Sequence, residues 1–491
     1  MIGDRQPRAG TPLGLWNMPP DDPDVYRMLQ AADTIGVFQV ESRAQMATLP
    51  RLRPETFYDL VVEVALIRPG PITGQMVHPY LNRRAGREPV VYPHPSLEPI
   101  LKRTLGVPLF QEQLLRIAMV AAGFTGGQAE ELRRALGFKR SRERMKAIEV
   151  KLRAGMARKG ITGAAADQIV LSITSFALYG FPESHSASFA LLVYASAYLK
   201  AHFPAAFYTA LLNNQPMGFY SPATLIKDAQ RHGVRFAPVD VQRSDWPCTI
   251  EADGRVRLGL RYVTGLRTEI GQRIAGSAAR FRSVEDLISR TGLNREELSV
   301  LAEIGALHAF GYTRREALWQ VERAIKATGE LFEEGTRDEG RGTRDEAVCP
   351  LPEMEGAERV IADYEGTGLT IGPHPMALRR EEMSLRGALR AADLARQRDG
   401  RRVRVAGAVI TRQRPGTAKG FVFLTLEDET GIANIIIRPD LFAERKLAIL
   451  QEPFLLVEGT LQNQDGVTSI RAERLEGLGG RPVEVEARDF Y

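Results

Sequence analysis

Apolar residues recur at helical spacing through most of the first 214 positions. The segments FYDLVVEVALI (57–67) and QEQLLRIAMVAAGF (111–124) place an apolar residue every three or four positions, which is the period of one helix face. The pattern predicts a mostly helical region from Val25 to about Asn214. The next stretch, 215–250, is mixed and predicts short strands and loops.

Some helix ends can be read from single residues. In TGGQAEELRRALG, Thr125 and Gln128 have the spacing of a capping box, and Gly137 provides a stop. Two helical hairpins are predicted further along the chain, LGLRYVTGLRTEIGQRIA turning on Gly265 and LNREELSVLAEIGALHAFG turning on Gly305.

After about residue 400 the period changes from helical to alternating, which is typical of strands. A short helix, LFAERKLAIL, falls between the third and fourth strand candidates, and five strands with a helix after the third are the plan of an OB-fold. The chain is therefore predicted to be a multidomain protein, α-rich with helix-hairpin-helix elements and then a β-barrel OB-fold domain. The five strand candidates are 402–410, 420–431, 433–439, 453–466 and 468–478.

Composition narrows the class of protein. The chain is 44% hydrophobic and 25% charged with a net charge of +5, as in an ordinary globular protein. Its two cysteines, Cys248 and Cys349, allow neither a disulfide framework nor a zinc module, which favours a cytoplasmic location. The longest apolar stretch, around 189–198, is too short to span a bilayer, and the first residues do not have the plan of a signal peptide.

Charge is concentrated in two places. Segment 130–160 holds eleven Lys or Arg against four Glu. Cations after a helix end, or a solvated helix face, would explain it, and a phosphate-binding surface is the third interpretation. Adjacent Arg133 and Arg134 would point about 100° apart on a helix. Segment 330–346 carries seven acidic residues against three arginines and repeats GTRDE, which predicts a flexible linker.

The stretch YGFPESHSASFALL contains a possible catalytic cluster. Ser184 or Ser186 beside His185 is not a nucleophile–base pair, because adjacent residues rarely reach each other and no third orienting residue follows. We interpret one of the serines as the N-cap of the following helix, and this leaves His185 available to a ligand at the helix start.

Three further features have both a purely structural and a functional interpretation. The turns at Gly265 and Gly305 could contact a phosphate strand through backbone N–H groups, or merely join helices. Phe421 and Phe423 alternate along a strand and could stack on bases, although the barrel core is the preferred interpretation. The D-x-D of Asp22 and Asp24 lies in a proline-broken loop, so it is not expected to hold the metal pair that phosphoryl transfer needs.

Several motifs together resemble a known family. GVFQVES (36–42), ALIRPGP (65–71), LFQEQLLRIA (109–118), GFTGGQAEELRRALGFKR (123–140) and the stretch 179–207 are similar to the fingers region of bacterial C-family DNA polymerases, the family of the polymerase III alpha subunit. TGLTIGPHPMALRR (367–380) and the final ARDFY resemble its error-prone, damage-inducible branch. The similarity runs from about residue 25 to 491.

The resemblance implies a template-directed DNA polymerase with a role in translesion synthesis and damage-induced mutagenesis, and with primer-template DNA and dNTPs as partners. Family members hold Mg²⁺ with three palm aspartates, and nothing in residues 1–24 matches the PHP or palm domain. The chain alone is therefore expected to be inactive and to need a PHP–palm half. Accessory mutagenesis proteins are further expected partners. Sliding-clamp binding is not favoured, because GELFEEG lacks the glutamine of a clamp-binding peptide.

The resemblance also assigns residues and domains. The nucleotide-binding candidates are Arg133, Arg134, Lys139, Arg140, Ser184 and His185, and the DNA-binding candidates are Arg68, Gly265, Arg267, Gly305, Phe421 and Phe423. A non-catalytic DNA-binding or scaffolding protein, or an inactive polymerase remnant, is the alternative. The expected parts are a linker remnant at 1–24, fingers at 25–250, duplex-binding hairpins at 251–328, a charged linker at 329–356, a connecting segment at 357–400, an OB-fold at 401–480 and a tail at 481–491.

Overall fold

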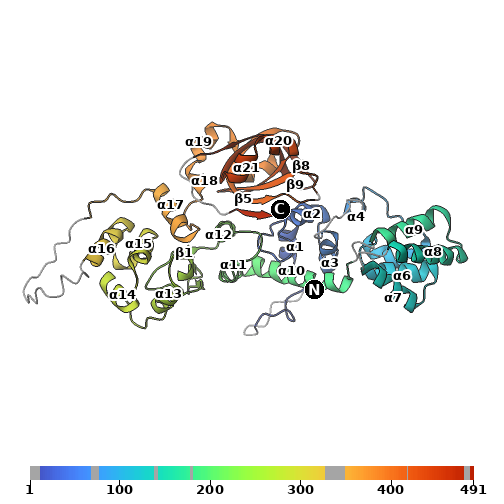
Figure 1. Cartoon of the computed structure of the whole chain (residues 1–491), viewed down its shortest axis with the longest axis horizontal. Coiled ribbons are helices and arrows are strands. Elements are labelled where there is room, and N and C mark those ends of the chain that lie inside the picture. Colours follow the sequence, from blue (N-terminus) through green and yellow to red (C-terminus); the bar gives the residue numbers. More distant parts are fainter. Residues whose placement is uncertain are drawn as a thin grey trace, which may run out of the picture. The chain divides into compact units, whose positions relative to one another are not determined.

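The structure is a computed structural model that describes residues 12–67, 77–137, 142–176, 181–326, 349–416, 418–479 and 487–490. The chain forms two compact units, one of Met1–His202 with Asp465–Val467 and one of Phe203–Gln464 with Thr468–Tyr491. Figure 1 shows the elements of both units. In the described part of the chain, no helix is both long enough and apolar enough to cross a membrane.

The first unit contains a bundle built around one long helix. Helix α10 (Glu183–His202) packs against α3 (Phe57–Leu66) and α1 (Pro23–Gln30), and α2 (Arg43–Leu52) packs against α1 and α3. Leu29, Leu49, Leu60 and Val193 are fully buried where these helices meet, and burying each such side chain stabilises the fold by about 1.5–3 kcal/mol. Lys200 at the end of α10 is also buried, where it donates to the Asp33 carboxylate at 2.9 Å and the Ile35 carbonyl at 3.0 Å.

A second helical cluster in this unit carries the basic segment. Its core includes Leu114, Leu132, Leu152 and Ile173. Thr125 and Gln128 form the predicted capping box, because the Gln128 side chain accepts from the Thr125 N–H at 2.9 Å and Thr125 Oγ accepts from the Gln128 N–H at 3.4 Å. The elements of this cluster are η1 (Pro95–Leu97), α5 (Glu98–Leu101), η2 (Lys102–Thr104), α6 (Gln111–Ala122), α7 (Gly126–Gly137), α8 (Arg142–Arg158) and α9 (Gly163–Phe176). Helix α4 (Val77–Arg84) precedes them and packs against α2 of the first bundle.

The second unit begins with helices and a small sheet. Each predicted hairpin has one short arm, since η3 (Leu260–Tyr262) precedes Gly265 and η4 (His308–Phe310) follows Gly305. The sheet has the order β1-β3-β2. The stretch that the sequence left mixed contains a regular helix, α12. The elements are α11 (Pro204–Asn213), α12 (Pro222–Arg231), β1 (Phe236–Ala237), β2 (Thr249–Ile250), β3 (Val256–Arg257), α13 (Thr268–Ala275), α14 (Val284–Thr291), α15 (Arg295–Glu303), α16 (Arg314–Lys326) and α17 (Gly356–Thr367).

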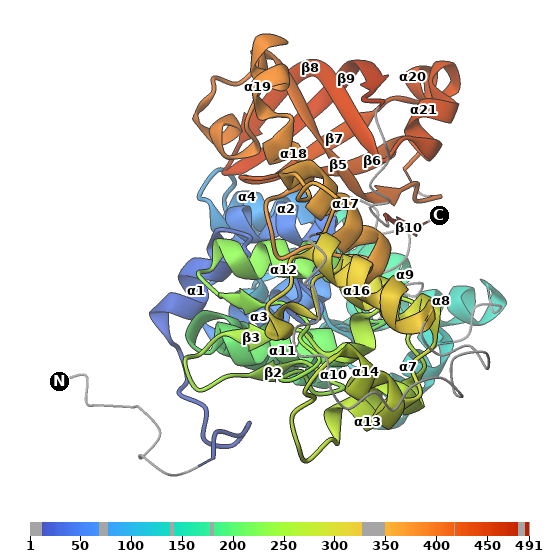
Figure 2. The same cartoon turned by 90° about the vertical axis from the view of Figure 1, so that its left-hand side faces the viewer.

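The predicted five-stranded barrel is confirmed (Figure 2). Its strands are β5 (Arg402–Gln413), β6 (Val422–Asp428), β7 (Gly431–Ile437), β8 (Phe454–Gln464) and β9 (Val467–Gly477). The order β5-β6-β7-β9-β8 closes through the antiparallel β5–β8 pairing, which leaves no free edge among these five strands. Between β7 and β8 the predicted single helix is two short ones, α20 (Pro439–Glu444) and α21 (Lys446–Gln451). Two short strands, β4 (Ala388–Leu389) and β10 (Arg488–Phe490), add to β5 in parallel.

The motif TGLTIGPHPMALRR joins helix α12 to the barrel. On α12, Lys227 donates to the Gly372 carbonyl and Gln230 donates to the Ile371 carbonyl at 2.8 Å. At the far end of the motif, Arg380 pairs with Asp428 at 3.0 Å, at the β6–β7 turn. The motif includes α18 (Pro375–Leu378) and leads into α19 (Arg380–Leu385) and η6 (Ala391–Arg396). Its side chains and backbone thus hold the barrel to α12.

Candidate nucleic-acid interface

The serines of the SHS stretch do not cap a helix. Helix α10 begins at Glu183, so Ser184 and Ser186 lie within its first turn, and the prediction that one of them is the N-cap is wrong because a cap precedes the first helical residue. Ser186 is fully buried and donates its hydroxyl to the Val61 carbonyl. Ser184 and His185 are exposed.

His185 belongs to a row of rings on one face of α10. Its ring centroid lies 5.2 Å from that of Phe181 and 4.3 Å from that of Phe189. Phe189 in turn meets Phe38 edge to face at 5.4 Å. The helix carries no charged Lys, Arg, Asp or Glu between Glu183 and Lys200. We call Phe38, Phe181, His185 and Phe189 the aromatic row, and its partly exposed rings offer faces on which a planar base can stack.

The start of α10 already holds carboxylates. Glu112 Oε2 accepts from the Glu183 N–H at 2.9 Å, and Glu183 Oε1 accepts from the Tyr58 hydroxyl at 2.9 Å. Burial raises the pKa of Tyr58, and its hydrogen bond to Glu183 raises that pKa further, so the hydroxyl remains a donor. Arg103 lies over the Tyr58 ring at 3.6 Å. Because these acids use the positive end of the helix, a phosphate bound there would have to displace Glu112.

Arg133 and Arg134 share one acidic partner. Glu130 lies 2.8 Å from the Arg133 guanidinium and 3.1 Å from that of Arg134. Hydrogen bonds from Arg133 and then Arg134 lower the pKa of Glu130 to about 2. The two arginines therefore converge on the previous turn instead of pointing apart as the sequence analysis expected, because their long side chains both reach i−3 or i−4. Both are exposed.

Other cations of the basic segment are also paired. Lys151 lies 3.1 Å from Glu131, and Arg153 lies 2.6 Å from Asp167. A solvated face with several ion pairs is part of the explanation for this segment. Among its described residues, Lys146, Arg158 and Lys159 are exposed and have no carboxylate partner, and Lys159 donates only to the Val120 carbonyl. Lys139, Arg140 and Arg68 lie outside the described residues.

The two hairpin glycines differ in what their N–H groups do. Gly265 has φ +75° and is exposed, and no described group accepts from its N–H. Gly305 has φ +81°, and its N–H donates to the Ala302 carbonyl at 3.0 Å as part of the end of α15. A β-carbon added at Gly305 would also meet the Arg314 guanidinium at 3.2 Å. Only the turn at Gly265 presents a free N–H of the kind that binds a phosphate.

Arg267 links the two hairpins. Its guanidinium donates to the Glu297 carboxylate at 2.8 and 2.9 Å, and its backbone N–H donates to the same carboxylate at 3.0 Å. Burial would raise the pKa of Glu297, but the hydrogen bonds from Arg267 and Asn294 outweigh it and lower the pKa to about 2. The side chain of Arg267 is 53% exposed, so it holds α15 in place while one side faces solvent.

The two phenylalanines of the barrel are not in its core. Val422 and Leu424 point into the core cluster of the barrel, whereas Phe421 and Phe423 are half-buried and alternate with them on the other side. The core interpretation is therefore wrong, because the inward register belongs to the even-numbered residues of β6. Phe423 lies opposite Gln413 of β5 and Ile436 of β7.

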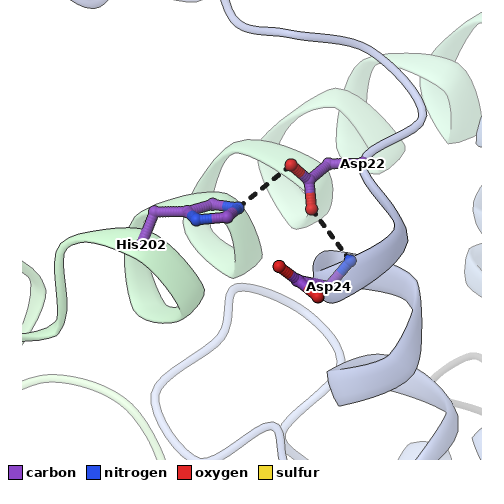
Figure 3. Close-up of side chains that lie close together, drawn as sticks. All are labelled: Asp22, Asp24 and His202. Atoms are coloured by element: carbon purple, nitrogen blue, oxygen red, sulfur yellow. Dashed lines mark hydrogen bonds and ion pairs between the residues drawn. The ribbon is translucent and has the colours of Figure 1, made fainter. Parts of the chain in front are cut away.

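Asp22, Asp24 and His202 come together at the start of α1 (Figure 3). Asp22 is the N-cap of α1 and accepts from the N–H groups of Asp24 and Val25; its other oxygen lies 3.1 Å from His202 Nε2. Asp24 pairs with Arg27. The D-x-D thus starts a helix, not the expected loop, because a proline is favourable at the first helical position. Since each oxygen-bearing group already has a partner, the cluster does not fit the open carboxylate pair that catalytic cations require.

Sequence reasoning missed most of the aromatic row. The spacing of Phe181, His185 and Phe189, four residues apart, could have revealed three of its members. Phe38 lies far away in the sequence and only the packing brings it there. Tyr58 and Arg103 were missed for the same reason, because no local pattern links them to Glu183.

Family models match three parts of the chain. Residues 3–160 match the bacterial DNA polymerase III alpha subunit finger domain, residues 233–317 match a helix-hairpin-helix motif, and residues 403–478 match an OB-fold nucleic acid binding domain. These agree with the predicted order of helical fingers, hairpins and OB-fold.

Curated relatives match nearly the whole chain. Proteins named error-prone DNA polymerase from Methylococcus capsulatus, Anaeromyxobacter dehalogenans (strain 2CP-C) and Pseudomonas aeruginosa are 48%, 49% and 46% identical to it. The alignments cover 98%, 98% and 99% of this chain and 48%, 43% and 47% of the respective relatives. The chain spans about half the length of the curated relatives it matches.

Proposed function

Because this chain belongs to the error-prone branch of the bacterial C-family, polymerase III alpha-like DNA polymerases, we propose that it supplies the nucleotide- and DNA-contacting part of a DNA-directed DNA polymerase. The enzyme would act in the cytoplasm, in translesion synthesis and damage-induced mutagenesis. Its partners would be primer-template DNA and dNTPs, with accessory mutagenesis proteins in addition.

The aromatic row on α10 is the observation that supports a nucleotide site. Stacking of a base on an aromatic ring is worth about 1–3 kcal/mol and tolerates any base, which suits an enzyme that copies damaged templates. His185 and Phe189 form the closest pair of the row at 4.3 Å. Since Glu112 already uses the helix start, the row would contact the base, and cations such as Arg133 and Arg134 would contact the phosphates only by leaving Glu130.

The hairpins and the barrel would hold the DNA. The free N–H at Gly265 would donate to a phosphate oxygen of the duplex without reading bases. The outer face of β6, with Phe421 and Phe423, would receive single-stranded template in the way of other OB-folds.

DNA polymerases of this type use divalent metal ions to activate the primer end and stabilise the transferred phosphate. The Asp22–Asp24–His202 cluster does not fit that role, because its groups cap α1 and pair with one another. We propose that Mg²⁺ is instead held by carboxylates of a PHP–palm half outside this sequence, and that this chain alone does not polymerise.

Primer extension tests the proposal. The chain is mixed with a separately made PHP–palm half, a primed template, Mg²⁺ and four dNTPs, and each half is also assayed alone. We expect extension only from the mixture. Replacing both His185 and Phe189 by alanine should reduce incorporation by about 5- to 150-fold, the equivalent of one lost stacking contact. Leu191→Ala changes an exposed residue of α10 that lies about 200° around the helix from Phe189, and it should leave incorporation unchanged.

Two outcomes would count against the proposal. Extension by this chain alone would mean that it holds catalytic carboxylates of its own. A mixture that binds DNA but never extends the primer would favour a DNA-binding scaffold.

A further inference from the structure

Five arginines from two separate stretches line one hollow of the first unit. Arg51 and Arg53 lie at the end of α2, and Arg83, Arg84 and Arg87 lie at the end of α4 and in the turn after it. We call these five residues the arginine hollow.

One of these arginines, Arg84, caps the C-terminal end of α2. Arg84 donates to the carbonyl of Leu52 at 2.7 Å and to that of Arg53 at 3.1 Å, and it pairs with Asp59 at 2.6 Å. It thereby satisfies the last carbonyls of α2, where a cation is favoured by the helix dipole. Arg83 pairs with the carboxylate of Glu88 at 3.1 Å, and Arg87 pairs with that of Asp465 at 2.9 Å.

Arg51 and Arg53 have no such structural role. Among the described residues, neither has a carboxylate partner. The Nε of Arg51 is buried and has no hydrogen-bond acceptor, and an unsatisfied buried donor costs about 1–3 kcal/mol. Arg53 is exposed in a left-handed conformation at φ 49°. The helix end needs only one cation, and Arg84 supplies it, so two further guanidinium groups in the same hollow repel without being needed there.

We propose that the arginine hollow binds the backbone phosphates of a single nucleic-acid strand through Arg51 and Arg53. A phosphodiester offers two oxygens that match the fork of a guanidinium, and it would give the Arg51 Nε the acceptor it lacks. Two carboxylates, those of Glu55 and Asp465, also line the hollow. Asp465 is paired with Arg87, and Glu55 would repel an anion, so a bound phosphate would have to lie away from it. The proposal deepens the proposed function, on which it rests, by adding a strand contact in the fingers region that is independent of the aromatic row.

Salt-dependent binding of a fluorescent 20-nucleotide oligo-dT tests it. Each phosphate contact contributes about 0.7 to the slope of log affinity against log salt for a single strand. The variant with Arg51→Gln and Arg53→Gln should therefore lower the slope by about 1.4 if both contacts are lost. Arg116→Gln, an exposed arginine of α6 in the same unit, is the matched control and should lower the slope by less than half of one contact.

Competition separates the possible sources of phosphate. We expect unlabelled oligo-dT to displace the labelled oligo-dT from the protein. We expect dATP and inorganic phosphate to displace the probe from the parent protein no better than from the double variant. Preferential competition by dATP or inorganic phosphate on the parent would overturn the assignment to a strand. The single variant Arg53→Gln changes only an exposed side chain, so it can be measured even if the double variant folds poorly. It should lower the slope by about 0.7.

The failure of this inference can be told from that of the proposed function. If the parent binds oligo-dT steeply and the Arg51–Arg53 variants match it in slope and affinity, the hollow is not a phosphate site while the polymerase proposal stands. If the parent does not bind DNA at all, both fall.

Discussion

The pair formed by Arg267 and Glu297 gives a sharp test of how the two hairpins hold together. Glu297 is 2% exposed, and its carboxylate accepts from two nitrogens of the Arg267 guanidinium and from the N–H groups of Arg267 and Asn294. Replacing Arg267 by methionine keeps the apolar part of the side chain and removes the charge. The buried carboxylate then keeps only the backbone donors.

The shift in the pKa of Glu297 gives the expected loss of stability in Arg267→Met. A decrease from about 4.5 to about 2 corresponds to about 3.4 kcal/mol in favour of the charged form. Because Arg267 itself is half exposed, solvent screens part of this, and we expect Arg267→Met to destabilise the hairpins by about 2–3 kcal/mol at neutral pH. A lowered pKa means that the stabilisation is present above pH 4.5 and lost as pH falls toward 2. The difference in stability between the parent and Glu297→Gln should therefore shrink by up to about 2 kcal/mol as pH falls from 7 to 3.

Hydrogen exchange with mass spectrometry is the suitable assay, because a multidomain chain does not unfold in one step and exchange reports local opening. Peptides covering α13 and α15 should exchange roughly 30- to 150-fold faster in Arg267→Met. Arg280→Met is the control, since the side chain of Arg280 is exposed and has no partner among the described residues. Unchanged exchange in Arg267→Met would refute the reasoning, and a double-mutant cycle with Glu297→Gln would then show no coupling.

Three further outcomes are expected. Lys200→Met should destabilise the α10 bundle by about 2–4 kcal/mol, because it removes the buried ammonium that pairs with Asp33; peptides covering α10 should then exchange hydrogen faster, and exchange equal to that of the parent would contradict the prediction. Gly155→Ala should speed hydrogen exchange in peptides covering α6 and α8, because the new β-carbon would lie 2.1 Å from the Ala122 carbonyl oxygen and force the two helices apart; exchange no faster than in the parent would mean that the two helices can adjust. Burial lowers the pKa of Lys227 to about 8, so the unfolded chain binds more protons between pH 8 and 10.5 and stability should rise with pH over that window; Lys227→Met should abolish the part of the rise that this residue causes, and an identical rise in both proteins would refute the assignment.

Local patterns were enough wherever a single element decided the outcome. The capping box at Thr125 and the five alternating strands of the barrel follow from short-range spacing, and the structure confirms them. Predictions about what a side chain contacts were less successful. Arg133 and Arg134 were expected to diverge and instead converge on Glu130, because a flexible side chain chooses among neighbours that helix geometry alone does not rank.

The same limit explains the errors at α10 and β6. The sequence does not say where a helix starts to within a residue, so Ser186 was taken for a cap although it is buried against α3. Which of two alternating faces of β6 turns inward depends on the closure of the barrel, and it placed Val422, not Phe421, in the core.

By itself, the sequence determined the order of helical, hairpin and barrel regions and the family, because periodicity and ordered motifs are properties of consecutive residues. Only the tertiary structure decided that Phe38 joins His185 and Phe189, and that Arg51 and Arg53 share a hollow with arginines some thirty residues away. The physical reason is that burial and charge act between side chains that packing brings together, and their sequence separation leaves no pattern to read.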